Sequence, residues 1–281
     1  MSEITEIEPP RIGRTLIMGI LNATPDSFYD GGRIRGPEQA YDLAVRMCAD
    51  GADWLDVGGE SSRPGAAPID QDEELRRVLP VFEALRGLPA RLSVDTRRAE
   101  TARRALASGA GMVNDVTALR DDPDMAAVVA ESGCLCVLMH MRGDPMTMQA
   151  APQYNDVVDD ICAFFEERIE AAARAGVRDE QLWLDPGFGF GKTPAHNLEL
   201  LRRLRAFKRF GRPVLIGTSN KSTIGAVLGV PVEERMEGTA ATVTAAIMNG
   251  ADAIRVHDVR AMARVARMTD AILAGEQYTH E

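Results

Sequence analysis

The sequence predicts an α/β fold built as a single (β/α)8 TIM barrel. Eight short apolar segments alternate with longer amphipathic segments along the chain, which indicates repeated β-then-α units. The chain has 281 residues, close to the ~250 that one such barrel typically needs. Glycines stand where helical segments end, as left-handed helix caps do. A doubly wound open sheet would show the same alternation, and the count of eight favours the closed barrel.

The eight candidate strands are short and almost entirely apolar, as expected of parallel strands that are buried on both faces. They are Leu16–Leu21, Trp54–Val57, Leu92–Val94, Met112–Val113, Leu135–Met139, Leu182–Leu184, Val214–Ile216 and Ala253–Val256. The segments between them place apolar residues three or four positions apart, which is the spacing of one helix face. Examples are Val78–Phe82–Leu85 and Leu198–Leu201–Leu204, and two late helices are expected over Glu234–Asn249 and Val259–Ala274. The capping glycines are Gly51, Gly109, Gly133, Gly176, Gly211 and Gly250.

Residues 1–15 are expected to form an N-terminal tail and residues 16–281 one domain, because no Pro/Ser-rich linker interrupts the alternation. The N-terminus lacks the basic-then-apolar layout of a signal peptide, and no apolar run approaches the ~20 residues that span a bilayer. These features predict a cytoplasmic protein. The four cysteines suit that compartment, and they lack the spacing of a zinc site. A net charge of −10 argues against nucleic acid as a partner, although local Arg and Lys can still bind a small anion.

In a β/α barrel the functional site forms at the carboxyl ends of the strands and in the loops that follow them. The residues at or just after the candidate strand ends are Asn22, Asp56, Asp95, Asn114, Asp115, Met139, His140, Asp185, Ser219, Lys221, Arg255 and His257. Asp56 and Asp115 have an equally good interpretation as turn or cap residues, and His140 is interpreted as structural. The convergence of both signs of charge on one rim indicates a pocket for a polar, partly anionic ligand.

Two long loops follow the first two candidate strands, over residues 22–32 and 58–66. Both are rich in Gly, Ser and Pro, and each carries a residue that is unusual in a plain spacer, Phe28 and Arg63 respectively. Such loops are candidates for lids that close over a substrate.

A third glycine-rich segment, Gly187–Lys192, superficially resembles a phosphate-binding P-loop. Pro186 stands where that motif requires its first glycine, so the spacing does not fit. We interpret the segment as a tight turn that holds Asp185 and Phe190 at the rim of the pocket.

Six segments, in order along the chain, carry the signatures of one known family. They are Met18-Gly-Ile-Leu-Asn-Ala-Thr-Pro-Asp-Ser-Phe28, Asp56-Val-Gly-Gly-Glu-Ser-Ser-Arg-Pro-Gly65, Ser93-Val-Asp-Thr96, Val113-Asn-Asp115, Leu184-Asp-Pro-Gly-Phe-Gly-Phe-Gly-Lys192 and Ile254-Arg-Val-His257. They resemble the signatures of dihydropteroate synthases, and the resemblance extends over the barrel from about Leu16 onward. It implies a folate-pathway transferase that condenses 6-hydroxymethyl-7,8-dihydropterin diphosphate with p-aminobenzoate, giving 7,8-dihydropteroate and diphosphate.

The resemblance also implies which residues bind each part of the substrates. The implied pterin site is Asp95, Asn114, Met139, Asp185 and Lys221; the diphosphate site is Asn22, Arg63, Arg255 and His257; the p-aminobenzoate site is Phe28, Ser62, Pro64, Phe190, Ser219 and Ser222. The implied catalytic residues are Arg63, Asp95, Lys221 and Arg255. A pterin edge of N–H donors and a carbonyl suits carboxylates and amides, and a leaving diphosphate needs nearby positive charge.

The family further implies a homodimer and Mg²⁺ bound with the diphosphate. Asn22 is the implied protein ligand of this ion, since an amide oxygen suits a hard cation that usually keeps several waters.

Two positions depart from the family pattern. Asn220 stands where the family usually has Arg, and Ser62 replaces the usual Thr. Asn cannot replace the fixed charge and paired donors of a guanidinium. Two alternatives stay open. One is a non-catalytic pterin-binding paralogue, for which Asn220 is the hint. The other is a methyltetrahydrofolate–corrinoid methyltransferase, a class that shares the barrel and the pterin site. The methyltransferase would not need Arg63 or the Thr-Pro-Asp-Ser-Phe loop.

Overall fold

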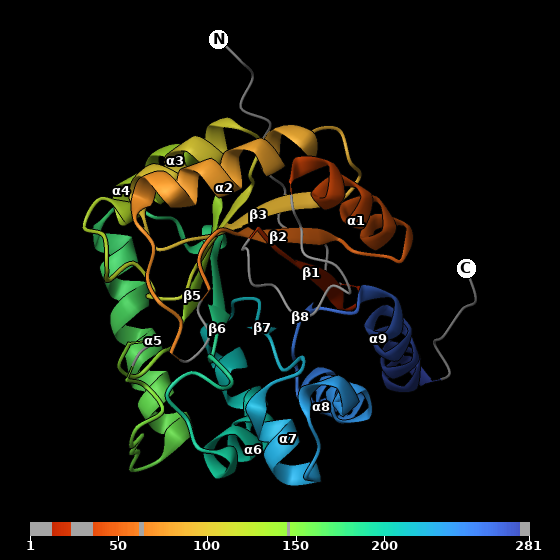
Figure 1. Cartoon of the computed structure of the whole chain (residues 1–281). Coiled ribbons are helices and arrows are strands. Elements are labelled where there is room, and N and C mark those ends of the chain that lie inside the picture. Colours follow the sequence, from red (N-terminus) through yellow and green to blue (C-terminus); the bar gives the residue numbers. More distant parts are fainter. Residues whose placement is uncertain (1–12, 24–35, 62–64, 145–146, 276–281) are drawn as a thin grey trace.

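The computed structural model describes residues 13–23, 36–61, 65–144 and 147–275. Parallel strands alternate with helices along this part of the chain (Figure 1). The strands are β1 (Leu16–Asn22), β2 (Trp54–Gly58), β3 (Arg91–Asp95), β4 (Met112–Asp115), β5 (Leu135–Met139), β6 (Leu182–Asp185), β7 (Leu215–Ile216) and β8 (Ala253–Val256). Every expected strand is present, and β5 and β8 have the expected bounds.

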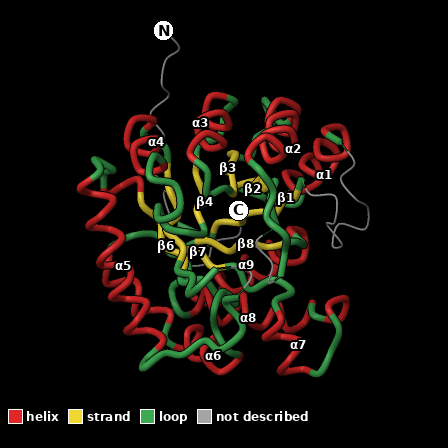
Figure 2. The backbone as a smooth tube through the Cα atoms, turned by 60° about the vertical axis from the view of Figure 1, so that its left-hand side comes forward, coloured by secondary structure: helices red, strands yellow, loops and turns green. Residues whose placement is uncertain are grey.

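The strands close into a barrel. They are hydrogen-bonded in the order β6-β5-β4-β3-β2-β1-β8-β7. The two ends of this order, β6 and β7, meet at a parallel bridge between Leu184 and Val214. The backbone N–H of Leu184 also donates to the oxygen of Pro213 at 2.9 Å. The helices surround the strands (Figure 2), which confirms the predicted β/α barrel and excludes the open sheet.

The α-helices of the described residues are α1 (Pro37–Ala49), α2 (Gln71–Ala84), α3 (Ala99–Ala107), α4 (Met125–Ser132), α5 (Val157–Arg174), α6 (Pro194–Arg202), α7 (Ser222–Leu228), α8 (Met236–Met248) and α9 (Val259–Ala274). Short 3₁₀ helices are η1 (Asp179–Gln181), η2 (Leu204–Phe210) and η3 (Val232–Glu234). The last helix has the expected bounds, whereas α8 begins at Met236 because Val232–Glu234 forms a separate turn.

Local sequence accounts for the helix ends. Asp70 caps α2 by accepting a hydrogen bond from the backbone N–H of Glu73 at 2.7 Å, and Pro37 stands in the first turn of α1. The expected capping glycines all have positive φ, as the turn out of a helix requires; for example, φ is 70° at Gly133 and 67° at Gly211.

One expected helix face is correct for Leu201 and Leu204, which are buried, and wrong for Leu198. The spacing of Leu198, Leu201 and Leu204 predicts a single buried face, but Leu198 is 46% exposed. Helix α6 ends at Arg202, and its buried residues include Leu200 and Leu201, while Leu204 begins the 3₁₀ turn η2. The buried stripe is therefore centred one residue away from the predicted one.

The apolar core of the described residues has two large layers, and a third, small cluster consists of Val116, Met139, Met141 and Met148. The larger layer lies between the strands and the helices and includes Val57, Phe82 and Phe165. The smaller one fills the barrel interior and consists of Leu16, Met18, Trp54, Met112, Leu135, Val137, Trp183, Leu215 and Ala253. The interior is thus packed with side chains, as in other closed barrels of this size.

Arg14 and Thr15, which directly precede β1, are bound to the barrel by side-chain contacts. Thr15 donates from its backbone N–H and its hydroxyl to Asp270 at 2.9 and 2.7 Å, and Arg14 pairs with Asp53. All four cysteines are unpaired, and Cys134 and Cys136 are buried. Within the described ranges, no helix combines the length and the apolar character that crossing a membrane would demand.

Candidate active site

The polar residues of the barrel mouth continue the inward-facing rows of the apolar interior. Side chains alternate between the two faces of a strand, so every second residue points inward. Trp54 on β2 and Trp183 on β6 belong to the interior layer. Two positions further along the same strands lie Asp56 and Asp185, and the same step from the interior of β4 reaches Asn114. The strands therefore deliver these polar groups to one rim.

Arg255 joins two carboxylates at the centre of this rim. Its Nε donates to Asp56 Oδ2 at 2.7 Å, and its Nη2 donates to Asp95 Oδ2 at 2.8 Å. Asn114 Nδ2 donates to the same Asp56 oxygen at 2.9 Å. The structure thus brings together three residues that the sequence assigned to the site, Asp95, Asn114 and Arg255. It adds Asp56, whose buried side chain holds two of them.

Burial controls the charge of the acids in this cluster. It raises the pKa of Asp95 to about 7, with the Arg255 guanidinium acting in the opposite direction and the Asp56 and Glu74 carboxylates raising the pKa further. Burial likewise raises the pKa of Asp185. The pocket therefore contains a carboxyl group that changes its charge near neutral pH.

Lys221 directly precedes α7, and its side chain lies at the same rim. Its Nζ donates to the backbone oxygen of Phe188 at 2.7 Å and lies 4.1 Å from the centre of the Phe190 ring. Burial lowers the pKa of Lys221 to about 7, while the nearby Asp185 carboxylate acts to raise it. The expected pterin residue Lys221 and the expected p-aminobenzoate residue Phe190 are thus in contact.

The segment after β6 is a tight turn. Asp185 Oδ1 accepts a hydrogen bond from the N–H of Gly187 at 2.7 Å, and the N–H of Phe190 donates to the oxygen of Gly187 at 3.0 Å. Gly187 has φ of 69°, and a Cβ there would lie 1.9 Å from the backbone oxygen of His140. Only glycine fits this position. The glycines therefore serve backbone packing, in agreement with our rejection of a P-loop.

Lys192 holds this turn through hydrogen bonds to its backbone oxygens, a role that the sequence did not reveal. Its buried Nζ donates to the oxygens of Gly187 at 2.9 Å and Phe190 at 3.1 Å, and lies 2.9 Å from Nδ1 of His140. Burial lowers the pKa of both Lys192 and His140 well below their usual ranges. The structural interpretation of His140 agrees with this buried contact.

The residues after β7 form a second group of contacts. Ser219 Oγ lies 3.0 Å from Nδ1 of His257, so these two expected site residues meet. Asn220 adopts the left-handed conformation with φ of 59°, which Asn tolerates better than most residues. Its N–H donates to Thr239 at 3.1 Å, and Arg235 donates to its backbone oxygen at 2.9 Å. A guanidinium therefore lies beside position 220 although the residue itself is Asn.

The other expected site residues have different settings. Asn22 ends β1 opposite Gly58 of β2, Met139 is buried at the end of β5, and Ser222 is exposed at the start of α7. The remaining four expected residues, Phe28, Ser62, Arg63 and Pro64, lie outside the described residues.

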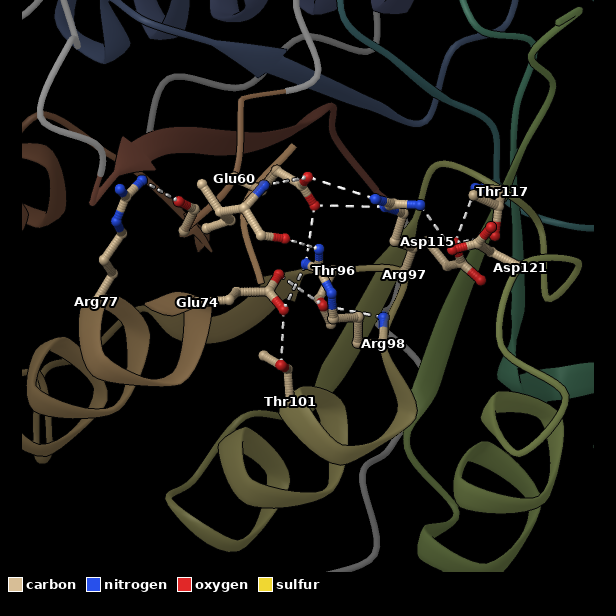
Figure 3. Close-up of polar contacts among 12 residues, drawn as sticks. Glu60, Glu74, Arg77, Thr96, Arg97, Arg98, Thr101, Asp115, Thr117 and Asp121 are labelled. Atoms are coloured by element: carbon tan, nitrogen blue, oxygen red, sulfur yellow. Dashed lines mark hydrogen bonds and ion pairs between the residues drawn. The ribbon is translucent and has the colours of Figure 1, made fainter. Parts of the chain in front are cut away.

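The two ambiguous aspartates have different roles. Asp115 organises a turn, because its carboxylate accepts from the N–H and hydroxyl of Thr117 at 2.8 and 2.7 Å (Figure 3). It also accepts from the N–H of Leu119 at 2.8 Å. Asp56 instead faces the barrel interior and binds Arg255 and Asn114. Side chains two positions apart on a strand share a face, so the inward-facing Trp54 predicts that Asp56 also faces the pocket.

A cavity of about 190 Å³ opens beside Asp95. Its lining includes Thr96, Arg97 and Val116 from the ends of β3 and β4, and Ser61 and Pro68 from the segment that follows β2. The cavity therefore connects the acidic rim with the second long loop.

The comparisons with known proteins agree with this geometry. The model of the family described as pterin binding enzyme matches residues 18–257. The dihydropteroate synthase of Synechocystis sp. is 47% identical over 261 residues, which cover 92% of this chain and 90% of that protein.

Solved structures are similar as well. The Yersinia pestis dihydropteroate synthase, in complex with a sulfonamide drug, has a TM-score of 0.92 at 43% identity, covering 95% of this chain and 97% of that one. The Xanthomonas albilineans dihydropteroate synthase, with 4-aminobenzoic acid, has a TM-score of 0.87 at 45% identity, covering 94% and 95%. The chain therefore belongs to the pterin binding enzyme family and, within it, to the dihydropteroate synthases, transferases of folate biosynthesis.

Proposed function

We propose that this chain condenses 6-hydroxymethyl-7,8-dihydropterin diphosphate with p-aminobenzoate, giving 7,8-dihydropteroate and diphosphate. The observation that carries the proposal is the convergence of two carboxylates, an amide and two cations on one barrel mouth. These groups belong to Asp95, Asn114, Asp185, Lys221 and Arg255. They offer acceptors for the edge of a pterin and positive charge for a diphosphate.

The acceptors suit a ligand with several N–H donors on one flat edge. Asn114 gives an N–H to Asp56, which leaves its own oxygen as an acceptor. Asp56 Oδ1 is buried and has no hydrogen-bond partner among the described residues. A buried acceptor without a donor is costly. The carboxylates of Asp95 and Asp185 supply the further acceptors that a pterin edge requires.

In the proposed reaction, diphosphate leaves before the amine attacks. The bond between the pterin methylene carbon and the diphosphate oxygen breaks, and the electron pair departs with diphosphate. The arylamine nitrogen of p-aminobenzoate then bonds to the methylene carbon and loses a proton to solvent. Arg255, Lys221 and His257 are the proposed groups that stabilise the negative charge of the leaving group, with Arg63 as a further proposed contact. Positioning and electrostatics supply the rate, and no covalent enzyme intermediate is formed.

The p-aminobenzoate site is proposed on the side of the pocket next to α7. Phe190 offers a flat apolar face beside the Lys221 ammonium, and Ser219 and Ser222 stand before and at the start of the helix. Phe28, Ser62 and Pro64 are the further proposed contacts from the two long loops. An aromatic acid matches this combination of an aromatic face, a cation and hydroxyl donors.

Asn22 is the proposed protein ligand of Mg²⁺. Its amide oxygen is a hard donor at the end of β1, beside the rim that would receive the diphosphate. The described residues contain no group of three or more His, Cys, Asp or Glu that could hold a metal. An ion at Asn22 would share its coordination with diphosphate oxygens and water, as Mg²⁺ commonly does. When bound, Mg²⁺ neutralises part of the diphosphate charge.

A cytoplasmic homodimer is the proposed form of the protein. Large apolar side chains are exposed on α7, α8 and α9, at Val227, Leu228, Met236, Met248, Met268 and Ile272. These exposed apolar residues support the proposal of an interaction surface on α7, α8 and α9. A second copy of the chain is the proposed occupant, since most oligomers of this kind are symmetric dimers. Light scattering after gel filtration would contradict this if the mass were that of one chain.

Turnover with the two substrates tests the proposed function directly. The protein is incubated with pterin diphosphate, p-aminobenzoate and Mg²⁺, while diphosphate release and dihydropteroate formation are followed in parallel. Equal amounts of both products are expected, and Asp185→Ala is the matched variant expected to lose activity. Tight pterin binding without diphosphate release would contradict the proposal and favour the non-catalytic paralogue. Methyl transfer from methyltetrahydrofolate would favour the methyltetrahydrofolate–corrinoid methyltransferase instead.

A further inference from the structure

The segment between β2 and α2 is tied together at its base. Glu60 lies just after β2, and Ile69 lies just before the residue that caps α2. The N–H of Ile69 donates to Glu60 Oε1 at 3.2 Å. Arg77 on α2 donates to the backbone oxygen of Gly59 at 3.0 Å. Both ends of the segment are therefore fixed close to each other.

Arg98, the residue that precedes α3, reaches both ends of this segment with one guanidinium. Its Nη1 donates to Glu60 Oε2 at 2.8 Å and lies 3.0 Å from Glu74 Oε2 (Figure 3). Its Nη2 donates to the backbone oxygen of Ile69. We call these four residues, Glu60, Ile69, Glu74 and Arg98, the Arg98 clasp. The Arg98 and Glu60 side chains are only 14% and 15% exposed, so water screens their attraction little.

Glu74 fastens the clasp to the end of β3. Its carboxylate is fully buried and accepts from the hydroxyls of Thr96 at 2.8 Å and Thr101 at 2.7 Å (Figure 3). Thr96 directly follows Asp95. Buried ion pairs contribute little net stability, because desolvation offsets their attraction. A buried charge cluster at this place is therefore better explained by the need to hold one geometry than by stability.

The clasped segment forms one wall of the cavity beside Asp95. Ser61, Ala66 and Pro68, which lie between the two clasped ends, line this cavity. The clasp joins this wall to the residue that follows Asp95, so it determines how far the wall stands from the acidic rim.

We propose that Arg98 is a positioning residue for the reaction, which holds the β2–α2 segment at its working distance from Asp95. The inference rests on the proposed function, in which Ser62, Arg63 and Pro64 of this segment contact diphosphate and p-aminobenzoate. Those three lie outside the described residues, whereas the clasp consists of described ones only. A misplacement of about 1 Å far from the reacting atoms can cost about a hundredfold in rate.

Arg98→Met removes the guanidinium and keeps the apolar stem. The expected result is a fall of about tenfold to about a hundredfold in kcat/KM for p-aminobenzoate. The affinity for 6-hydroxymethylpterin, which has no diphosphate, should change less than about twofold. Arg103→Met, which changes an exposed arginine of α3, is the matched control and should leave both values unchanged. Arg98→Lys, which keeps the charge without the planar fork, should recover part of the loss.

A second variant separates positioning from folding. Arg98→Met leaves Glu74 buried without its cation, which is expected to lower stability. Combining Arg98→Met with Glu74→Gln removes the unpaired charge, and the amide oxygen can still accept from Thr96 or Thr101. The double variant should be folded by circular dichroism yet keep the loss in kcat/KM. A folded double variant with wild-type kcat/KM would overturn the proposal, as would an equal loss of 6-hydroxymethylpterin affinity in Arg98→Met.

Hydrogen exchange gives a readout that does not depend on turnover. Peptides covering residues 60–69 should exchange faster in Arg98→Met than in the wild type or in Arg103→Met, because the segment loses the contacts of Arg98 with Glu60 and with the backbone oxygen of Ile69. If the wild type forms no dihydropteroate, the proposed function fails while the exchange rates still test the clasp. Unchanged exchange in Arg98→Met would overturn the clasp whatever the activity.

Discussion

Asp95→Asn should stabilise the protein above neutral pH while it removes pterin recognition. The Asp95 carboxylate lies in the barrel mouth and accepts from Arg255 at 2.8 Å. Burial raises its pKa from the ordinary 3.8 to about 7, against the attraction of Arg255 and together with the repulsion of nearby Asp56 and Glu74. Asparagine has almost the same shape and can still accept from Arg255, but it never carries the charge.

The size of the effect follows from the two pKa values. Between pH 3.8 and about 7 the folded protein keeps a proton on Asp95 that the unfolded chain has already lost. The folded state binds more protons in this window, so stability falls as pH rises through it. The window spans about three pH units at ~1.4 kcal/mol each, which makes the ionised Asp95 cost on the order of 4 kcal/mol at pH 8.

Urea unfolding of the wild type and of Asp95→Asn across a range of pH measures this cost. The free energy of unfolding of the variant minus that of the wild type should increase by about 3 kcal/mol between about pH 5 and about pH 8. Taking the difference removes the contribution of groups that titrate alike in both proteins. A difference that stays flat, or that decreases with pH, would refute the reasoning. Binding of 6-hydroxymethylpterin by calorimetry should be lost in the same variant.

Three further predictions concern the same rim. Asp95 and Lys221 both have pKa values of about 7. With increasing pH, kcat/KM should therefore rise as Asp95 ionises and fall as Lys221 loses its proton. Lys221→Arg should remove the alkaline fall in a profile of kcat/KM against pH. Gly187→Ala places a Cβ 1.9 Å from a carbonyl oxygen, so the free energy of unfolding, measured by thermal unfolding, should fall by more than about 3 kcal/mol. In Gly65→Ala the residue also has positive φ but the space around it is open, so the fall should be only about 1 kcal/mol. Lys192→Met unties the turn after β6, and the KM for p-aminobenzoate should rise about tenfold with an unchanged fold by circular dichroism; an unchanged KM would contradict the role of Lys192.

The barrel was predictable because its signals are local. A buried parallel strand needs a short apolar run, and Leu135–Met139 and Ala253–Val256 have the predicted bounds. Helix ends depend on neighbouring residues, which is why the capping glycines were correct. The prediction for Leu198 of α6 was wrong because apolar spacing alone leaves the centre of a buried stripe uncertain by one residue, and packing decides it.

The sequence by itself therefore determined the barrel, the rim on which polar residues gather and the family. Only the tertiary structure decided which of these residues touch. Arg255 and Asp56 are 199 positions apart, and Lys192 and His140 are 52 apart, so no local pattern links them. The Arg98 clasp likewise joins residues from the segment after β2, from α2 and from the position before α3, which have no common motif. Burial also shifts the pKa of Asp95 and Lys221 toward neutrality, and burial exists only once the strands and helices have packed.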